Sequence, residues 1–230
     1  MVAVLSTGGE VTEPGKALPP GKIYDINAYS IGTVVIESGG KLIYFGVVPD
    51  DKAALTKTLR CALASADMVI TSGGVSVGPK DFTPQIVDSL GKPGLIVYGI
   101  AVKPGKPTTV GFVEDKPVFS LPGHPTSALL IFYLLVRPIL QRLSGRTVSE
   151  IKSIRAFAGA RMFSAKGRRT FVMVRLSLDE NGKLFAEPVE TGASGAITTL
   201  AKADGFVEVP ENQQFIDVDE EVIVKLFKTV

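Results

Sequence analysis

Apolar and polar positions follow two different patterns along this chain. Up to about residue 147, short apolar runs typical of buried strands are separated by longer segments with helical periodicity. The predicted strands are 2–6, 42–48, 67–70, 95–102, 108–113 and 117–120, and the predicted helices are 27–37, 50–66, 83–90 and 125–143. Because strands and helices alternate, we predict an α/β domain over residues 1–147, a mostly parallel sheet with helices on both faces.

The pattern changes in the last third of the chain. From residue 148 the apolar segments are short and strand-like, and turn residues such as Asp179-Glu180-Asn181-Gly182 separate them. The predicted strands are 154–157, 170–178, 183–188, 205–209 and 221–227. We therefore predict a small β-barrel domain over residues 148–230.

Composition narrows the classes of function. The 230 residues carry a net charge of +2, which does not indicate a nucleic-acid surface. The single cysteine, Cys61, excludes an internal disulfide and is expected to be a small buried hydrophobe. Met1 runs directly into a strand pattern, and the longest apolar run, 128–136, is too short for a bilayer. We expect a soluble, cytoplasmic protein that acts on small molecules, with no membrane partner.

A glycine-rich turn carries the strongest chemical signal. An apolar run, 68–70, leads into Thr71-Ser72-Gly73-Gly74-Val75-Ser76-Val77-Gly78-Pro79-Lys80-Asp81, and Thr83-Pro84 then resembles a helix N-cap and first helical residue. Glycines allow close backbone approach, and free N–H groups at a helix start favour anions. Asp81 in such a turn points to a metal ion or a proton transfer. The alternative is a tight connection without a ligand.

Known phosphate motifs do not fit this turn. Gly73 and Gly78 have the Walker A spacing, but Pro79 stands where the lysine belongs. No G-x-G-x-x-G follows a predicted strand.

Other polar groups follow further strand ends. Since carboxyl ends of parallel strands share one sheet edge, Glu10, Asp50 and the turn Lys103-Pro104-Gly105-Lys106-Pro107 are expected to converge with the glycine turn. Lys103 and Lys106 suit an oxyanion, although solvated lysines are equally consistent with the sequence. Asp50 and Asp51 have a simpler interpretation as partners of a helix dipole.

Three further groups of residues could bind an anion, act in catalysis or have a simpler role. Thr126 and Ser127 lie in the first turn of a predicted helix, where they either bind an anion or only cap the helix. His124, the only histidine, is expected to be a helix-entry residue rather than a general base. Arg168 and Arg169 either clamp an oxyanion or form a solvated turn. Together these groups indicate a multiply anionic ligand with a divalent cation such as Mg²⁺.

Five motifs resemble the molybdopterin molybdenumtransferase family, which includes MoeA and the E domain of gephyrin. The resemblance covers nearly the whole chain and rests on Ser6-Thr7-Gly8-Gly9-Glu10, Ile23-Tyr24-Asp25-Ile26-Asn27, the glycine turn with Asp81, Lys103-Pro104-Gly105-Lys106-Pro107, and Leu121-Pro122-Gly123-His124-Pro125-Thr126-Ser127-Ala128. It implies the last step of molybdenum cofactor assembly: adenylylated molybdopterin and molybdate are bound, AMP is released with a divalent cation, and molybdenum stays on the dithiolene.

The resemblance also implies roles for single residues. Asp81 and Asp50 would be catalytic and hold the metal ion. Arg168 would reach in from the barrel domain, with Ser194 or Thr198. The remaining cofactor-binding residues would be Ser72, Gly73, Gly74, Ser76, Gly78, Lys103, Lys106, Pro107, Gly123 and Ser127. A homodimer is expected.

Two departures from the family and three alternatives remain. Full-length members carry two further domains before the segment that starts here, and they commonly have an acidic residue near Pro79-Lys80. The alternatives are a MogA-like molybdopterin adenylyltransferase, a non-catalytic molybdopterin-binding or scaffold module, and a nucleotide-processing protein like the competence-damage family.

Overall fold

The chain forms two compact units. The computed structural model describes residues 1–74, 82–148, 150–189 and 197–227. The first unit comprises Met1–Ile100 and Gly105–Val148, and the second comprises Ala101–Pro104 and Ser149–Val230. The expected domains, 1–147 and 148–230, differ from these units in the placement of residues 101–104 and 148.

A six-stranded sheet forms the centre of the first unit. Its order is β4 (Leu42–Val48), β1 (Val2–Thr7), β5 (Met68–Ser72), β9 (Lys116–Leu121), β8 (Thr109–Val113) and β6 (Pro93–Tyr98). The first four strands are parallel, and β8 and β6 run antiparallel to their neighbours. The mostly parallel α/β sheet expected from the sequence is therefore confirmed.

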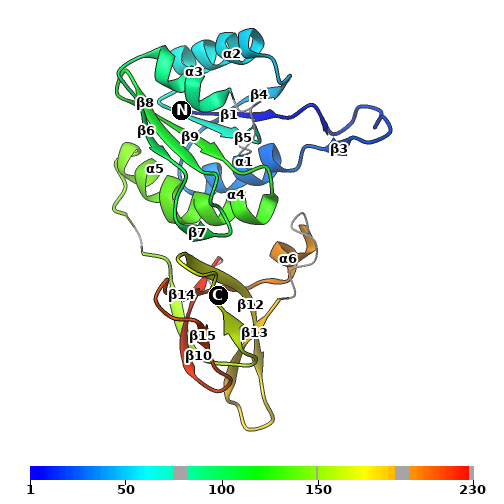
Figure 1. The fold of residues 1–230 in the computed structure, drawn as a ribbon, viewed down its shortest axis with the longest axis vertical. Helices are drawn as coiled ribbons and strands as arrows, with labels where there is room; N and C mark the ends of the chain where they lie inside the picture. Colours follow the sequence, from blue (N-terminus) through cyan, green and yellow to red (C-terminus); the bar gives the residue numbers. More distant parts are fainter. Residues whose placement is uncertain (75–81, 149, 190–196, 228–230) are drawn as a thin grey trace. The chain divides into compact units, whose positions relative to one another are not determined.

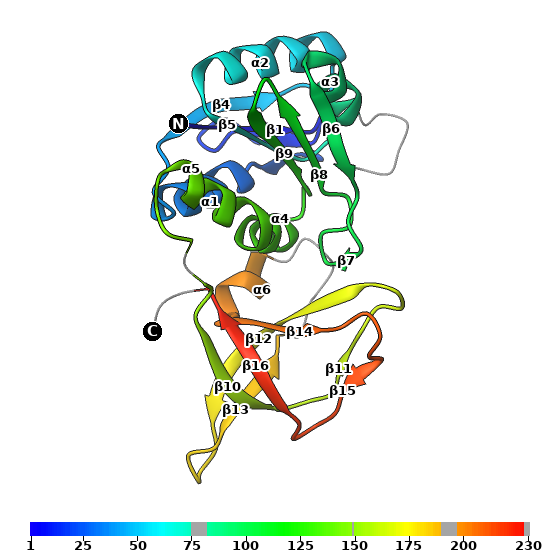
Figure 2. The same cartoon turned by 90° about the vertical axis from the view of Figure 1, so that its left-hand side faces the viewer.

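Helices cover both faces of this sheet (Figures 1 and 2). One face carries α2 (Lys52–Ser65) and α3 (Thr83–Leu90), whose apolar side chains pack with Ala3 and Leu5 of β1. The other face carries α1 (Asn27–Glu37) and the helical run α4 (Pro125–Ile131), η1 (Phe132–Val136) and α5 (Arg137–Leu143). Because neighbouring strand residues point to opposite faces, each buried strand supplies both layers of the core.

The helical run Pro125–Leu143 is long and apolar enough, by length and composition alone, to be a membrane-span candidate, with a mean hydropathy of 1.3. In this structure it contacts α1 and β9, and Leu130, Ile131, Phe132 and Val136 are completely buried. It is thus a core helix of the α/β unit. The expected helix over 125–143 is present, with one π turn in its middle.

Two expected N-cap residues, one helix start and one burial expectation were wrong. Asn27, expected to cap the first helix, is itself the first residue of α1, and Ile26 is the N-cap residue. The helix expected to start at Asp50 begins at Lys52, with Asp51 as its N-cap residue. Thr83 is the first residue of α3 rather than its cap. Cys61 is exposed, because it lies on the outer side of α2.

A closed five-stranded β-barrel forms the second unit (Figure 2). Its strands follow the order β13 (Leu184–Pro188), β10 (Ser153–Ala158), β16 (Glu221–Leu226), β14 (Gly205–Val209) and β12 (Arg169–Leu178), and β13 pairs with β12 to close the ring. Small apolar residues such as Ala156, Ala158 and Ala186 fill the interior. The predicted barrel is confirmed.

Four short elements complete the second unit. β7 (Val102–Lys103) pairs in parallel with β12, so this segment extends the barrel sheet. β11 (Met162–Phe163) and β15 (Phe215–Ile216) form a small ladder, and α6 (Ile197–Lys202) is one short helix.

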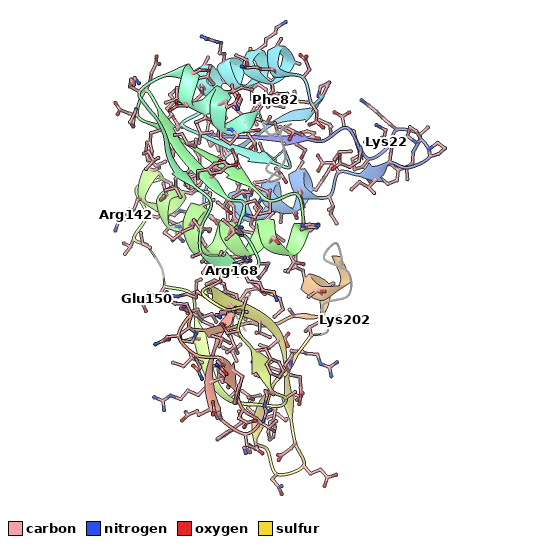
Figure 3. All side chains as sticks on the ribbon, in the orientation of Figure 1. Lys22, Phe82, Arg142, Glu150, Arg168 and Lys202 are labelled. Carbon is pink, nitrogen blue, oxygen red and sulfur yellow. The ribbon has the colours of Figure 1, made fainter. Side chains whose placement is uncertain are left out.

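An arm projects from the sheet of the first unit between β1 and α1 (Figure 1; Lys22 is labelled in Figure 3). It consists of β2 (Val11–Thr12), β3 (Ile23–Tyr24) and an exposed connection. The Lys22 ammonium donates a hydrogen bond to the Gly9 carbonyl, and Glu13 accepts one from the Val47 N–H at 3.4 Å. These contacts fix the base of the arm, where Glu10 lies.

Candidate functional site

A cavity of about 420 Å³ lies where β1, β5 and β9 end. Segments far apart in the sequence line it: the β1 loop, the start of α1, the glycine turn, the 106–107 segment and the entry to α4. The lining residues are Ser6, Thr7, Glu10, Val11, Ile23, Asp25, Asn27, Ser72, Gly73, Gly74, Lys106, Pro107, Pro122, Gly123 and His124. Ligands of open parallel sheets bind at this edge.

The glycine turn packs tightly against the β1 loop. Gly73 and Gly74 have φ values of +85° and +66°, a region that favours glycine. A Cβ on Gly73 would lie 2.2 Å from the Thr7 carbonyl oxygen, and the Gly73 N–H donates to Leu121 O at 3.2 Å. The two glycines are therefore required by packing between protein segments, in addition to any approach of a ligand. Ser76, Gly78 and Asp81 lie outside the described residues.

Asn27 joins two walls of the cavity. Its Nδ2 donates to Ser72 Oγ and to the Gly123 carbonyl, both at 2.7 Å. Gly123 is 96 positions away in the sequence, so no local pattern predicts this contact. Asn27 was quoted in a motif but was missed as a site residue.

Several buried polar atoms in the cavity wall have no hydrogen-bond partner. Among the described residues these include Ser6 Oγ, Thr7 Oγ1 and Asn27 Oδ1. An unpaired buried polar atom costs about 1–3 kcal/mol. Natural folds keep such atoms mainly where a water, an ion or a ligand completes them.

A buried carboxylate, Asp25, also lines the cavity and was missed as a site residue. It accepts hydrogen bonds from the Ala28 N–H at 3.1 Å and from the Tyr44 hydroxyl at 3.2 Å. Partial burial, and then the charge of Asp25, raise the pKa of Tyr44 far above its ordinary value. Tyr44 therefore stays protonated and keeps Asp25 oriented.

Two further carboxylates meet at the turn Gly8-Gly9. Asp50 Oδ2 accepts a hydrogen bond from the Gly9 N–H at 2.8 Å. A Cβ on Gly8 would lie 2.9 Å from Glu10 Oε2, and one on Gly9 would lie 3.6 Å from Asp50 Oδ2. Asp51 has a different task, because its Oδ1 accepts the Ala54 N–H at 2.7 Å and caps α2.

Two carboxylates beside Gly8-Gly9 are candidate ligands for Mg²⁺. Within the described ranges, no group of three His, Cys, Asp or Glu side chains could hold a metal ion. Mg²⁺ is commonly held by one or two carboxylates together with water and substrate phosphates. Glu10 lines the cavity and Asp50 binds the N–H of the adjacent Gly9, so the two carboxylates of this turn are the candidates for that role.

The predicted basic residues do not all gather at the cavity. Lys106 and Pro107 line it, whereas Lys103 lies in β7, opposite Thr170 of the barrel, and is exposed. This differs from the expectation that the whole lysine turn lies at the sheet edge. Gly105 is the first residue that returns to the α/β unit.

The arginines also have separate roles. Arg168 (labelled in Figure 3) lies in a loop of the barrel where its N–H donates to Ala165 O at 3.0 Å. Arg169 forms ion pairs with Glu208 and Glu211, each at 3.2 Å, and these pairs lie on the surface of the barrel. Ser194 and the side chain of Thr198 lie outside the described residues.

Some of the residues that lead into the core helix line the cavity, and others do not. Gly123 and His124 line the cavity, and His124 is the N-cap residue of α4, as expected of a helix-entry residue. Ser127 is buried in the first turn and is not among the lining residues.

Comparison with known proteins agrees with this division of the chain. A family profile described as a probable molybdopterin binding domain matches residues 3–142, and one described as the MoeA C-terminal region (domain IV) matches residues 155–227. The molybdopterin molybdenumtransferase of Haemophilus influenzae is 34% identical over 227 residues, which are 98% of this chain and 56% of that protein. The protein of the same name from a Nostoc species is 33% identical, over 97% of this chain and 52% of its own length.

A solved structure is similar over the full chain. The molybdopterin biosynthesis MoeA protein from Pyrococcus horikoshii shares 44% identity with a TM-score of 0.87, and the match covers 100% of this chain and 55% of that one. The chain therefore spans about half the length of the relatives it matches.

Proposed function

This chain belongs to the MoeA family of molybdopterin molybdenumtransferases, and from that membership we propose that it takes part in inserting molybdenum into the molybdenum cofactor. The substrates in this proposal are adenylylated molybdopterin and molybdate. The products are AMP and a dithiolene that carries molybdenum.

The observation that carries the proposal is the composition of the cavity wall. Its lining residues include Lys106, which carries an ammonium group, the hydroxyl residues Ser6, Thr7 and Ser72, and the loop before the helical run Pro125–Leu143. Molybdate and phosphate are oxyanions, so they accept hydrogen bonds from ammonium and hydroxyl groups and are favoured at a helix N-terminus.

In this proposal each side chain has a distinct role. Lys106 binds an oxyanion and offsets its charge, and Asp50 orients the Gly9 backbone beside Glu10. Asp50, Glu10 and, outside the described residues, Asp81 would hold Mg²⁺ at the edge of the cavity. When bound, Mg²⁺ would neutralise charge on the phosphates of the substrate.

A molybdate- and Mg²⁺-dependent AMP release assay tests the proposal. We expect Lys106→Ala to weaken apparent molybdate affinity by about tenfold or more, since a charge-assisted hydrogen bond contributes about 1.5–3 kcal/mol. Lys57→Ala on the exposed side of α2 is the matched control and should leave affinity unchanged. Asp81→Asn should slow AMP release.

Unchanged AMP release in both Lys106→Ala and Asp81→Asn would contradict the proposal. A binding module without turnover is the second candidate, because the chain spans about half the length of its relatives. That function predicts tight binding of adenylylated molybdopterin with no release of AMP.

We also propose that the protein is a cytoplasmic homodimer. The exposed apolar side chains Tyr29 and Ile36 on α1 and Tyr44 on β4 support an interface on this side of the α/β unit. Sedimentation velocity tests the oligomeric state, and a monomer at high protein concentration would contradict this part.

A further inference from the structure

Asn27 occupies a central position in the cavity wall. It is the first residue of α1 and is 7% exposed. It lies between two segments that are far apart from each other in the sequence. Its two side-chain hydrogen bonds reach Ser72, at the end of β5, and Gly123, before α4.

The partner at Gly123 fixes the orientation of the amide. A backbone carbonyl oxygen only accepts hydrogen bonds, so the group facing it must be Nδ2 rather than Oδ1. Both N–H bonds of that amide are then committed, one to Gly123 O and one to Ser72 Oγ. Because Ser72 Oγ accepts this bond, its own proton remains to be donated to another group.

A second contact depends on the same arrangement. The Gly73 N–H donates to Leu121 O at 3.2 Å, directly beside the two partners of Asn27. Gly73 is also packed against the Thr7 carbonyl, so the glycine turn is set by β1 on one side and by β9 on the other. Asn27 supplies the side-chain link in this arrangement.

We propose that Asn27 is a positioning residue that holds Ser72–Gly74 and Pro122–His124 in the geometry that receives the anionic substrate. The inference has two parts. The fixed position of the two segments concerns the free protein alone. The effect on substrate binding rests on the proposed function. Asn27 acts through Ser72 and Gly123 and need not touch the reacting atoms.

The test uses the whole chain with Asn27→Asp, Asn27→Ala and Ser38→Ala. Aspartate has nearly the shape of asparagine but cannot donate to Gly123 O when ionised, and alanine removes both bonds. Ser38 is a buried polar residue at the other end of the same helix, so Ser38→Ala controls for general destabilisation of α1.

The first readout is hydrogen exchange of the Gly73 amide, measured by NMR without ligand. We expect both Asn27 variants to speed this exchange by about tenfold, the effect of losing one net hydrogen bond. The Ser38 amide, which donates to Val34 O at 3.0 Å, should keep its protection in those variants. In Ser38→Ala the Gly73 amide should exchange as in the unmodified chain.

The second readout is the affinity for adenylylated molybdopterin. We expect both Asn27 variants to bind about tenfold or more weakly, and Ser38→Ala to bind normally. Adding Ser72→Ala to Asn27→Ala should cost less than the two single losses combined, because the residues act through one bond.

Two results would overturn the inference: Gly73 exchange that stays unchanged in both folded Asn27 variants, or affinity that stays unchanged in both. If Asn27→Ala does not fold, Asn27→Asp decides the outcome, and if neither folds, Asn27→Ser does. Failure of the unmodified chain to bind the pterin nucleotide would instead contradict the proposed function. The exchange readout would still test whether Asn27 positions the two segments.

Discussion

Gly73 and Gly145 both have positive φ values, but their surroundings differ. A Cβ on Gly145 (φ +71°) would meet nothing within 4 Å, whereas a Cβ on Gly73 (φ +85°) would overlap the Thr7 carbonyl. The comparison separates two costs of adding a methyl group: the conformational cost, which both positions share, and the steric cost, which only Gly73 has.

We predict that Gly73→Ala destabilises the protein more than Gly145→Ala. The left-handed conformation costs about 1–2 kcal/mol in each variant. Overpacking at Gly73 should add about 1–3 kcal/mol. Urea unfolding of the two variants measures the difference, and equal losses of stability would show that the turn relaxes away from Thr7.

Tyr44 gives a prediction about pH. Its pKa is raised in the folded protein by partial burial and by Asp25, so the folded state favours the protonated hydroxyl. The stabilisation is fully present below the unfolded pKa of about 10 and is lost as pH rises further.

Above about pH 10, unfolding free energy should fall more steeply in the unmodified chain than in Tyr44→Phe, because phenylalanine does not titrate. Tyr24→Phe is the control, since the Tyr24 hydroxyl donates to Lys16 O on the exposed arm. Parallel pH profiles for the unmodified chain and Tyr44→Phe would contradict the account.

At the scale of elements, the adjacent residues Asp50 and Asp51 perform different tasks. Asp51 caps α2 through the Ala54 N–H, and Asp50 holds the Gly9 N–H beside Glu10. The sequence shows two acids before a helix and does not distinguish them. The distinction comes from the loop after β1, which approaches one carboxylate and not the other.

We predict that Asp51→Ala lowers stability by about 0.5–2 kcal/mol, the usual cost of removing an N-cap. Asp50→Ala should leave α2 capped but weaken Mg²⁺-dependent AMP release. Thermal unfolding and the AMP assay, applied to both variants, check this assignment. The reverse pattern, with Asp51→Ala losing activity and Asp50→Ala losing only stability, would refute it.

Helix and strand types were predictable, whereas the N-cap residues of the helices were less so. The apolar periodicity of 27–37, 83–90 and 125–143 is strong enough to define each helix. The caps were misassigned because Asp25 accepts the Ala28 N–H from outside α1, and because Thr83 is already helical. Several polar residues at each start could serve as a cap, and tertiary contacts choose among them.

At the scale of the whole molecule, the arrangement of the sheet accounts for the predictable part of the site. Ser72, Gly73, Gly74, Lys106, Pro107 and Gly123 were expected at the carboxyl edge, and all six line one cavity. Parallel strand order is enough to bring these loops together.

The unpredicted part depends on contacts of long sequence separation. Asn27 reaches Gly123, and Asp25 reaches Tyr44, through folding of the sheet rather than through a local motif. Lys103 was expected in the loop that follows a strand ending at Val102, yet Val102–Lys103 pairs with β12 of the barrel.

The most direct measurement is a crystal structure of the chain with adenylylated molybdopterin and molybdate. The account predicts density for the ligand in the cavity lined by Ser72–Gly74, Lys106 and Gly123. It further predicts an oxyanion within hydrogen-bond distance of the Lys106 ammonium. A ligand bound elsewhere on the α/β unit, with this cavity holding solvent alone, would contradict it.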